Sequence, residues 1–231
     1  MAASFLEIHR VGKIFSPHQN VEVRALSDID LAIRRGEFAV LSGPSGSGKT
    51  TLLNIIGGLD NASSGTVLLD GILVTDLEEK RLSALRRDHI GFVFQAYNLI
   101  PVLTARENIE YVMRLQGRSP AACDRRSQEV AAKLAITELL DKLPNQLSGG
   151  QQQRVAVARA VAAKPKLILA DEPTANLDSK SAVNLMDMMQ QLNEDEGITI
   201  IFSSHDPMVI SKAKHSIVLR DGKVVANEHL D

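Results

Sequence analysis

Residues 43–50 read Gly-Pro-Ser-Gly-Ser-Gly-Lys-Thr, which fits the phosphate-binding loop pattern G-x-x-x-x-G-K-[ST]. A short apolar run at 38–41 precedes this loop, and apolar residues at helical spacing follow it at 52–56. The loop therefore joins a predicted strand to a predicted helix, which is the context that the pattern requires. A flexible turn rich in Gly and Ser is the alternative, and this context disfavours it.

The residue types of this loop suit the phosphates of a nucleotide. Glycines let backbone N–H groups close around phosphate oxygens, and the N-terminus of the following helix adds positive partial charge. We expect Lys49 to reach the β- and γ-phosphates, Thr50 to ligate Mg²⁺ and Thr51 to bond the α-phosphate. The predicted phosphate-binding residues are Gly43, Ser45, Gly46, Ser47, Gly48, Lys49, Thr50 and Thr51.

A pair of acidic residues ends a second apolar run. Residues 167–170 are all apolar and lead directly into Asp171 and Glu172. In enzymes with a phosphate-binding loop, an Asp at the end of such a strand holds Mg²⁺. The adjacent Glu172 could accept a proton from the attacking water. An ordinary solvated strand end is the alternative, and the phosphate-binding loop makes it the weaker one.

The rest of the chain reads as an α/β core interrupted by helices. Further strands are predicted at 5–8, 21–33, 66–69, 90–94, 198–202 and 216–219, and further helices at 78–87 and 181–193. The polar residues 16–20 predict a hairpin bend, and Asp221-Gly222 predicts a second hairpin turn. We expect one domain over 1–231, with the core formed by 1–95 and 163–231 and a helical subdomain over 96–162.

Composition excludes several classes of protein. The 26 basic and 28 acidic residues of the 231 give a net charge of −2, so we expect no nucleic-acid partner. No apolar stretch is long enough to span a bilayer, and we expect no signal peptide. The single cysteine, Cys123, excludes an internal disulfide, and its charged neighbours predict an exposed, incidental position. The six histidines show no metal-ligand spacing, and all except His205 are assigned structural roles.

Residues 147–151, Leu-Ser-Gly-Gly-Gln, precede a predicted helix over 152–163. A small Ser-Gly-Gly turn at a helix N-terminus is a second phosphate-binding geometry. One nucleotide does not need two such sites in one chain, so this turn has a distinct role. With this signature and the phosphate-binding loop together, the chain resembles the ATPases of ATP-binding-cassette (ABC) transporters over nearly its whole length.

The resemblance implies a fold and an assembly. The fold is an α/β P-loop NTPase with a RecA-like core, an N-terminal antiparallel β subdomain and an inserted α-helical subdomain. Two cassettes pair head-to-tail, so that each ATP lies between the phosphate-binding loop of one and the signature of the other. Ser148 and Gly150 are then expected at the γ-phosphate in trans, with Gly149 and Gln151 at the same turn. Asp178 matches the family's D-loop and is expected at the dimer interface.

The same resemblance assigns roles to three isolated residues. Gln95 matches the family's Q-loop and is expected to contact Mg²⁺ or the attacking water. His205 matches the switch histidine that contacts the γ-phosphate. Phe15 matches the aromatic residue that stacks on adenine, although Tyr is commoner there. Ser204 stands where Thr often precedes the histidine. Neither departure is expected to abolish ATP binding, because stacking uses the ring face.

Three stretches, 54–60, 91–101 and 103–108, resemble one bacterial branch of the family. That branch holds the lipoprotein-releasing, macrolide-exporting and cell-division ATPases. It implies a permease partner with a large periplasmic domain, a periplasmic adaptor as a further candidate, and a peripheral position on the cytoplasmic face of the bacterial inner membrane. Residues 97–103 are expected to receive the permease's coupling helix, with packing inside the helical subdomain as the alternative. A regulatory ATPase of the cell-division or cell-wall machinery remains the alternative function.

Overall fold

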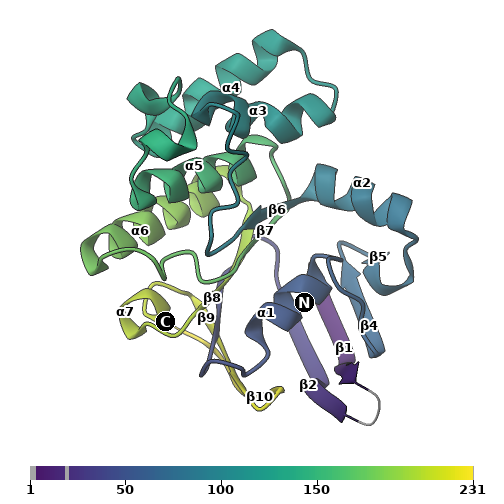
Figure 1. Cartoon of the computed structure of the whole chain (residues 1–231). Helices are drawn as coiled ribbons and strands as arrows, with labels where there is room; N and C mark the ends of the chain where they lie inside the picture. The colour runs from purple at the N-terminus through teal and green to yellow at the C-terminus, as the bar shows by residue number, and fades with distance from the viewer. Residues whose placement is uncertain (1–3, 19–20, 231) are drawn as a thin grey trace.

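The computed structural model describes residues 4–18 and 21–230, which form two β-sheets and a layer of helices (Figure 1). The strands are β1 (Leu6–His18), β2 (Val21–Ile33), β3 (Phe38–Ser42), β4 (Ser64–Leu69), β5 (Ile72–Leu73), β6 (Ile90–Val93), β7 (Leu167–Ala170), β8 (Thr199–Ser204), β9 (His215–Arg220) and β10 (Lys223–His229). The α-helices are α1 (Lys49–Ile56), α2 (Glu79–His89), α3 (Ala105–Leu115), α4 (Pro120–Lys133), α5 (Gly149–Ala162), α6 (Ser179–Glu196) and α7 (Pro207–Ile210). Short 3₁₀ helices lie at Val74–Asp76, Thr137–Leu139 and Pro144–Gln146.

The central sheet has the strand order β10-β9-β3-β8-β7-β6. Strands β9, β3, β8, β7 and β6 run parallel, and β10 joins β9 antiparallel. All residues of β3, β7 and β8 are buried, as expected for strands covered on both faces. The carboxyl ends of the parallel strands meet at one edge of the sheet. The loops that follow β3, β7 and β8 are thereby brought together.

Two hydrophobic cores lie on opposite faces of this sheet. Side chains alternate along a strand, so Phe38 and Val40 of β3 join one core while Ala39 and Leu41 join the other. The first core contains the buried faces of α3, α4, α5 and α6. The second contains α1 and the inner face of the antiparallel sheet. The sheet therefore connects the helical layer to the N-terminal strands.

The antiparallel sheet has the order β2-β1-β4-β5. The register between β1 and β2 is irregular opposite Asp28, which has a φ of 48°. The predicted bend over 16–20 is wrong in extent, because β1 continues to His18, which pairs with Val21. Ladder hydrogen bonds to β2 outweigh the local turn preference of this polar stretch. Residues 19–20 of the bend lie outside the described structure.

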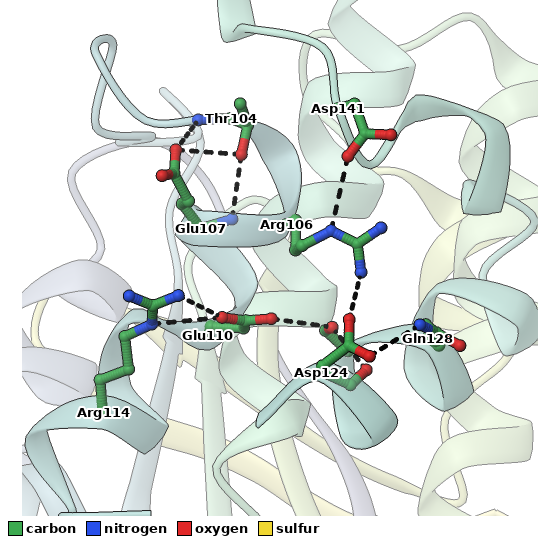
Figure 2. A network of polar contacts seen from close by, with 9 residues as sticks. Thr104, Arg106, Glu107, Glu110, Arg114, Asp124, Gln128 and Asp141 are labelled. Atoms are coloured by element: carbon green, nitrogen blue, oxygen red, sulfur yellow. Dashed lines mark hydrogen bonds and ion pairs between the residues drawn. The ribbon is translucent and has the colours of Figure 1, made fainter. Parts of the chain in front are cut away.

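The helical segment between β6 and β7 is held together by polar contacts (Figure 2). Thr104 caps α3 in a reciprocal capping box with Glu107. Arg106 of α3 donates to Asp124 of α4 at 2.7 Å. Glu110 is buried, and its carboxylate accepts from two residues, one on each helix. These contacts fix α3 against α4 alongside their apolar packing.

Cys123 is buried, and the prediction of an exposed cysteine is wrong. It lies on the inner face of α4 together with Val130 and Ala131. The charged residues beside Cys123 suggested a solvated segment, but Arg126 of that group is also buried, at 6% exposure. Burial raises the pKa of the Cys123 thiol, which disfavours a reactive thiolate.

Buried Arg126 ties the helical segment to α6. Its guanidinium donates to Glu196 at 2.5 Å and to Glu129 at 2.8 Å. Burial alone would raise the pKa of Glu196, but the hydrogen bond and charge of Arg126, with help from Lys133, hold that pKa below its ordinary value. The pair is therefore ionised at neutral pH and anchors one corner of the helical layer.

Candidate active site

The phosphate-binding loop follows β3 at the carboxyl edge of the sheet and leads into α1 (Figure 1). It forms one wall of an open pocket of about 550 Å³. Residues from the loops after β3, β6, β7 and β8 meet there. The pocket is lined by Ala25, Pro44, Ser45, Gly46, Gly48, Lys49, Thr50, Thr51, Gln95, Glu172, Ala175 and His205.

Two glycines in this loop are required by its geometry. Gly43 has a φ of 138°, and a Cβ there would lie 2.0 Å from the carbonyl oxygen of Leu219. Gly48 has a φ of 105°, and a Cβ there would lie 2.8 Å from the carbonyl oxygen of Ala25. Any other residue would have to adopt a strained backbone and displace neighbouring main chain. The loop is therefore packed tightly on its outer side and open toward the pocket.

Lys49 places a cation inside the loop. Its side chain is buried, and Nζ donates to the carbonyl oxygens of Gly43 at 2.8 Å and Pro44 at 3.1 Å. Ser47 contributes a buried hydroxyl that has no hydrogen-bond partner within the described structure. Ser47 and Gly43, both predicted to bind phosphate, are not among the residues that line the pocket. The Lys49 ammonium, which does line the pocket, suits a polyanion.

Thr50 and Asp171 lie together, as expected for two residues that share a metal ion. The Thr50 hydroxyl donates to the Asp171 carboxylate at 2.8 Å. Ser203 of β8, which was not among the predicted site residues, donates to the same carboxylate at 2.7 Å and accepts from the Glu172 backbone N–H at 2.8 Å. Its only signal in the sequence is its position two residues before His205. Hydroxyl and carboxylate oxygens are the ligands that Mg²⁺ prefers.

Glu172 and His205 both line the pocket, and their side chains are in hydrogen-bonding contact. The Nδ1 atom of His205 lies 3.1 and 3.2 Å from the two oxygens of the Glu172 carboxylate. Glu172 has a φ of 45°, an uncommon backbone for a residue other than glycine. Such strain collects at functional sites, and the hydrogen bond from its backbone N–H to Ser203 helps to hold it. The arrangement provides a carboxylate that can accept a proton at the pocket wall.

Gln95 lies in the pocket wall, on the loop after β6. Its backbone carbonyl accepts from Asn176 at 3.0 Å. Arg159 of α5 donates to the carbonyl oxygens of Tyr97 at 3.0 Å and Asn98 at 2.5 Å. Both of those residues have positive φ, at 61° and 49°. Arg159 therefore holds this loop in an otherwise unfavourable backbone conformation.

Phe15 stands apart from the pocket wall, on β1. Its ring is 40% exposed, and the Nζ atom of Lys13 lies 4.7 Å from the ring centroid. That ammonium is fixed by Asp60 at 2.6 Å and by the carbonyl of Asn61 at 2.7 Å. The ring is therefore held from one side and keeps an exposed surface, as adenine stacking requires.

The signature lies in a different pocket from the phosphate-binding loop. Ser148 caps α5 in a reciprocal capping box with Gln151, and Gly149 and Gly150 form the first turn of that helix. Ser148, Gly150 and Gln151 line a pocket of about 280 Å³, which shares no lining residue with the larger one. Within one chain the structure therefore does not bring the signature to the phosphate-binding loop.

Asp178 is the N-cap of α6, and its partner Ser181 lines this second pocket. Its carboxylate accepts hydrogen bonds from the backbone N–H of Ser181 at 3.0 Å and from the Ser181 hydroxyl at 2.6 Å. These bonds lower the pKa of Asp178. The side chain is exposed and ionised at neutral pH, so it is available at the surface that carries the signature.

Comparison with known proteins identifies the family. The family described as ABC transporter matches residues 26–175, which include the phosphate-binding loop, the signature and the Asp171-Glu172 pair. The chain belongs to the ABC transporter family. This cassette is accordingly an ATPase with the P-loop NTPase fold. None of the helices in the described ranges is long and apolar enough to cross a membrane.

Relatives match this cassette over nearly its whole length. It is 44% identical over 229 residues to the ABC transporter ATP-binding protein MJ0796 of Methanocaldococcus jannaschii, covering 97% of each chain. It is 41% identical to the bacitracin export ATP-binding protein BceA of Halalkalibacterium halodurans, covering 98% of this chain and 89% of that one. The macrolide export ATP-binding/permease protein MacB of Rhodopseudomonas palustris is 44% identical, and 34% of its length is covered.

Solved structures of MJ0796 match the cassette closely. A dimeric post-hydrolysis state bound to ADP and Pi superimposes with a TM-score of 0.91 at 42% identity, covering 98% of this chain and 99% of that one. A second dimeric structure, described as a bacterial ABC transporter cassette, has the same TM-score at 43% identity. The predicted fold class and the predicted branch of the family are thereby confirmed.

Proposed function

We propose that this cassette closes as a head-to-tail homodimer around two ATP molecules with Mg²⁺ and drives a separate membrane subunit in export or extraction. The observation that carries the proposal is the separation of the signature pocket from the phosphate-binding loop. Each pocket offers half of a nucleotide site, and a second copy would supply the other half. The dimeric structures of the relative MJ0796 support this arrangement.

In this proposal each residue near the phosphates has one task. The phosphate-binding loop and Lys49 hold the phosphate chain. Thr50 and Asp171, with Gln95, would hold Mg²⁺, which would neutralise charge on the β- and γ-phosphates. Glu172 accepts the proton of the attacking water as its oxygen bonds to the γ-phosphorus and the bond to ADP breaks. His205 contacts the γ-phosphate beside it.

Replacing Lys49 by Ala is expected to weaken ATP binding by about 10- to 100-fold, because a hydrogen bond between charged groups contributes about 1.5–3 kcal/mol. Within the described ranges, the polar contacts of this side chain are with the loop and Glu172, so we expect the substitution to leave the fold intact. Calorimetric titration with a non-hydrolysable ATP analogue measures the change. Lys80→Ala, on the exposed surface of α2, serves as the control and is expected to bind like the native chain. Unchanged affinity of Lys49→Ala would remove it from the proposed phosphate site.

A second surface suits the membrane partner. A groove of about 340 Å³ beside the Gln95 loop is mainly apolar, and its walls include Leu59, Phe92, Ile100, Tyr111 and Leu115. We refer to it as the apolar groove. Its leucines are half-exposed although they are large and apolar. Such a groove fits the apolar face of a short amphipathic helix, here the coupling helix of the permease.

Replacing Leu115 by Asp is expected to abolish capture of the membrane partner while leaving the ATPase activity of the isolated cassette unchanged. The side chain is 56% exposed, so the charge does not disturb the core, but it would be buried unpaired against an apolar helix. Co-purification from detergent-solubilised membranes measures the effect. Val225→Asp on β10, with 55% exposure at the sheet edge, is the matched control. Equal capture by both variants would place the partner elsewhere.

The partner itself is best identified with a trapped closed dimer. Glu172→Gln is purified with ATP from solubilised membranes, and co-purified proteins are identified by mass spectrometry. A permease with few transmembrane helices and a large periplasmic domain is the expected result. The export names of BceA and MacB, and the permease part in the name of MacB, motivate this expectation. A cell-division or cell-wall complex would instead support the regulatory function, and recovery of soluble proteins alone would contradict a membrane complex.

A further inference from the structure

Three potential metal ligands meet at the edge of the central sheet opposite the phosphate-binding loop. Glu37 directly precedes β3, His215 begins β9, and His229 ends β10. His215 and His229 are paired across the two antiparallel strands. One ligand atom from each of the three side chains lies within 4.8 Å of the others. None of these residues takes part in the nucleotide site.

The contacts of His215 favour a cation at this position. Its side chain is buried, with Nδ1 2.9 Å from Oε2 of Glu37 and Nε2 2.6 Å from Oδ1 of Asn227. A neutral imidazole carries one proton, so it can donate to only one of these two oxygens. If Nε2–H donates to Asn227, the lone pair of Nδ1 faces the Glu37 carboxylate. A metal ion bound by both atoms resolves this repulsion.

We propose that Glu37, His215 and His229 form a site for a divalent transition-metal ion of the Zn²⁺ type. Two imidazoles and one carboxylate are typical ligands of Zn²⁺, whereas Mg²⁺ prefers oxygen ligands alone. Asn227 does not bind the metal itself: its side-chain oxygen accepts a hydrogen bond from Nε2 of His215, which fixes the ring and leaves Nδ1 free for the metal. Metal-bound histidines commonly have such a partner. A water molecule completes four-fold coordination.

Small movements of two exposed side chains, His229 and Arg34, would complete the site. Ligand atoms around tetrahedral zinc lie about 3.4 Å apart, so separations of up to 4.8 Å here have to close by at most about 1.4 Å. His229 is exposed and close to the end of the described chain, and its ring lies 4.1 Å from that of His215. Arg34 competes for the same groups, at 3.5 Å from His229 and 3.6 Å from Glu37. Its side chain is 64% exposed, so it can turn into solvent when metal binds.

A bound metal would link β10 to the neighbouring strands of the central sheet. Strand β10 is an edge strand whose ladder partner is β9 alone. Coordination by His229 would join its end to β9 and to the start of β3. Because the metal binds only the folded chain, it raises the unfolding temperature.

The test uses the full chain without a histidine tag, in excess Mg–ADP so that the carboxylates of the nucleotide site are occupied. Zn²⁺ is titrated by calorimetry, and Co²⁺ is added as a visible-absorption probe of tetrahedral nitrogen and oxygen ligands. We expect one Zn²⁺ per chain, an intense Co²⁺ band and a higher unfolding temperature. His229→Gln and Glu37→Gln are expected to weaken Zn²⁺ binding by about 10- to 100-fold or more.

Two further variants separate this site from other histidines. His9→Gln removes an exposed histidine that lies 3.3 Å from Glu7, a similar pair without a third ligand, and is expected to bind Zn²⁺ like the native chain. Arg34→Gln removes the competing cation and is expected to bind at least as tightly as the native chain. Binding that is unchanged in His229→Gln and Glu37→Gln would overturn the proposal. So would the absence of a Co²⁺ band from the native chain, because the hydrogen-bonding groups around His215 would then be satisfied without a metal ion.

Discussion

Replacing Glu172 by Gln is expected to lower ATP turnover by about 100- to 10,000-fold while ATP still binds, because the substitution removes only the proton acceptor. Gln has nearly the same shape as Glu, so the contact with His205 and the unusual backbone conformation persist. The phosphate-binding loop and Lys49 are unchanged. ATP that binds without being hydrolysed should hold the two cassettes together. The variant is therefore expected to elute as a dimer with ATP and as a monomer with ADP.

The measurement is phosphate release at saturating ATP, combined with size-exclusion chromatography. Glu194→Gln provides a matched control, because that carboxylate lies on the surface of α6 and pairs with Lys214. It is expected to hydrolyse ATP at the native rate. Native turnover by Glu172→Gln would show that another group accepts the proton. Loss of ATP binding along with turnover would assign Glu172 to ground-state binding instead.

Mixing two inactive variants is expected to restore activity if each nucleotide site is shared between chains. Ser148→Arg disables the signature half of the site, and Lys49→Ala disables the loop half. In a mixed dimer, one site combines both defects and the other combines two native halves. Random pairing makes half of the dimers mixed, so about a quarter of native activity is expected when the sites act independently.

A second mixture controls for non-specific recovery. Lys49→Ala and Glu172→Gln both damage the same half of the site, so every mixed dimer carries two defective sites and no recovery is expected. Steady-state ATP hydrolysis over a range of mixing ratios measures both pairs. If the first mixture is no more active than its components, the signature does not serve the partner's nucleotide. Equal recovery in both mixtures would also contradict the shared site.

Most of the core was predictable from the sequence because local signals agreed with tertiary structure. The apolar runs at 167–170 and 198–202 fall in β7 and β8, which are buried on both faces. The hairpin turn predicted at Asp221-Gly222 joins β9 to β10. The extent of the edge strand β10 was not predicted, because its exposed residues carry no strong pattern. The position of β10 is determined by its hydrogen bonds to β9, and local composition does not encode that pairing.

The candidate site was predictable where it is contiguous in the chain. The phosphate-binding loop, the acidic pair and the signature are each short motifs, and the structure brings the first two together. Ser203 was missed because its role depends on β8 lying beside β7. The cluster of Glu37, His215 and His229 was missed for the same reason, because strand register alone joins ligands so far apart in sequence. The burial of Cys123 depends on which face of α4 meets the core.

The hydrogen bonds from Arg159 to the loop after Gln95 couple the movement of α5 to the movement of that loop. The signature forms the first turn of α5, which begins at Gly149. Arg159 lies ten residues further on, about 15 Å along the helix axis. If a nucleotide held by a second cassette shifted this first turn in the proposed dimer, the far end of α5 would shift the Gln95 loop, which lines this chain's own pocket. Nucleotide occupancy at one site would then alter the position of Gln95 at the other site.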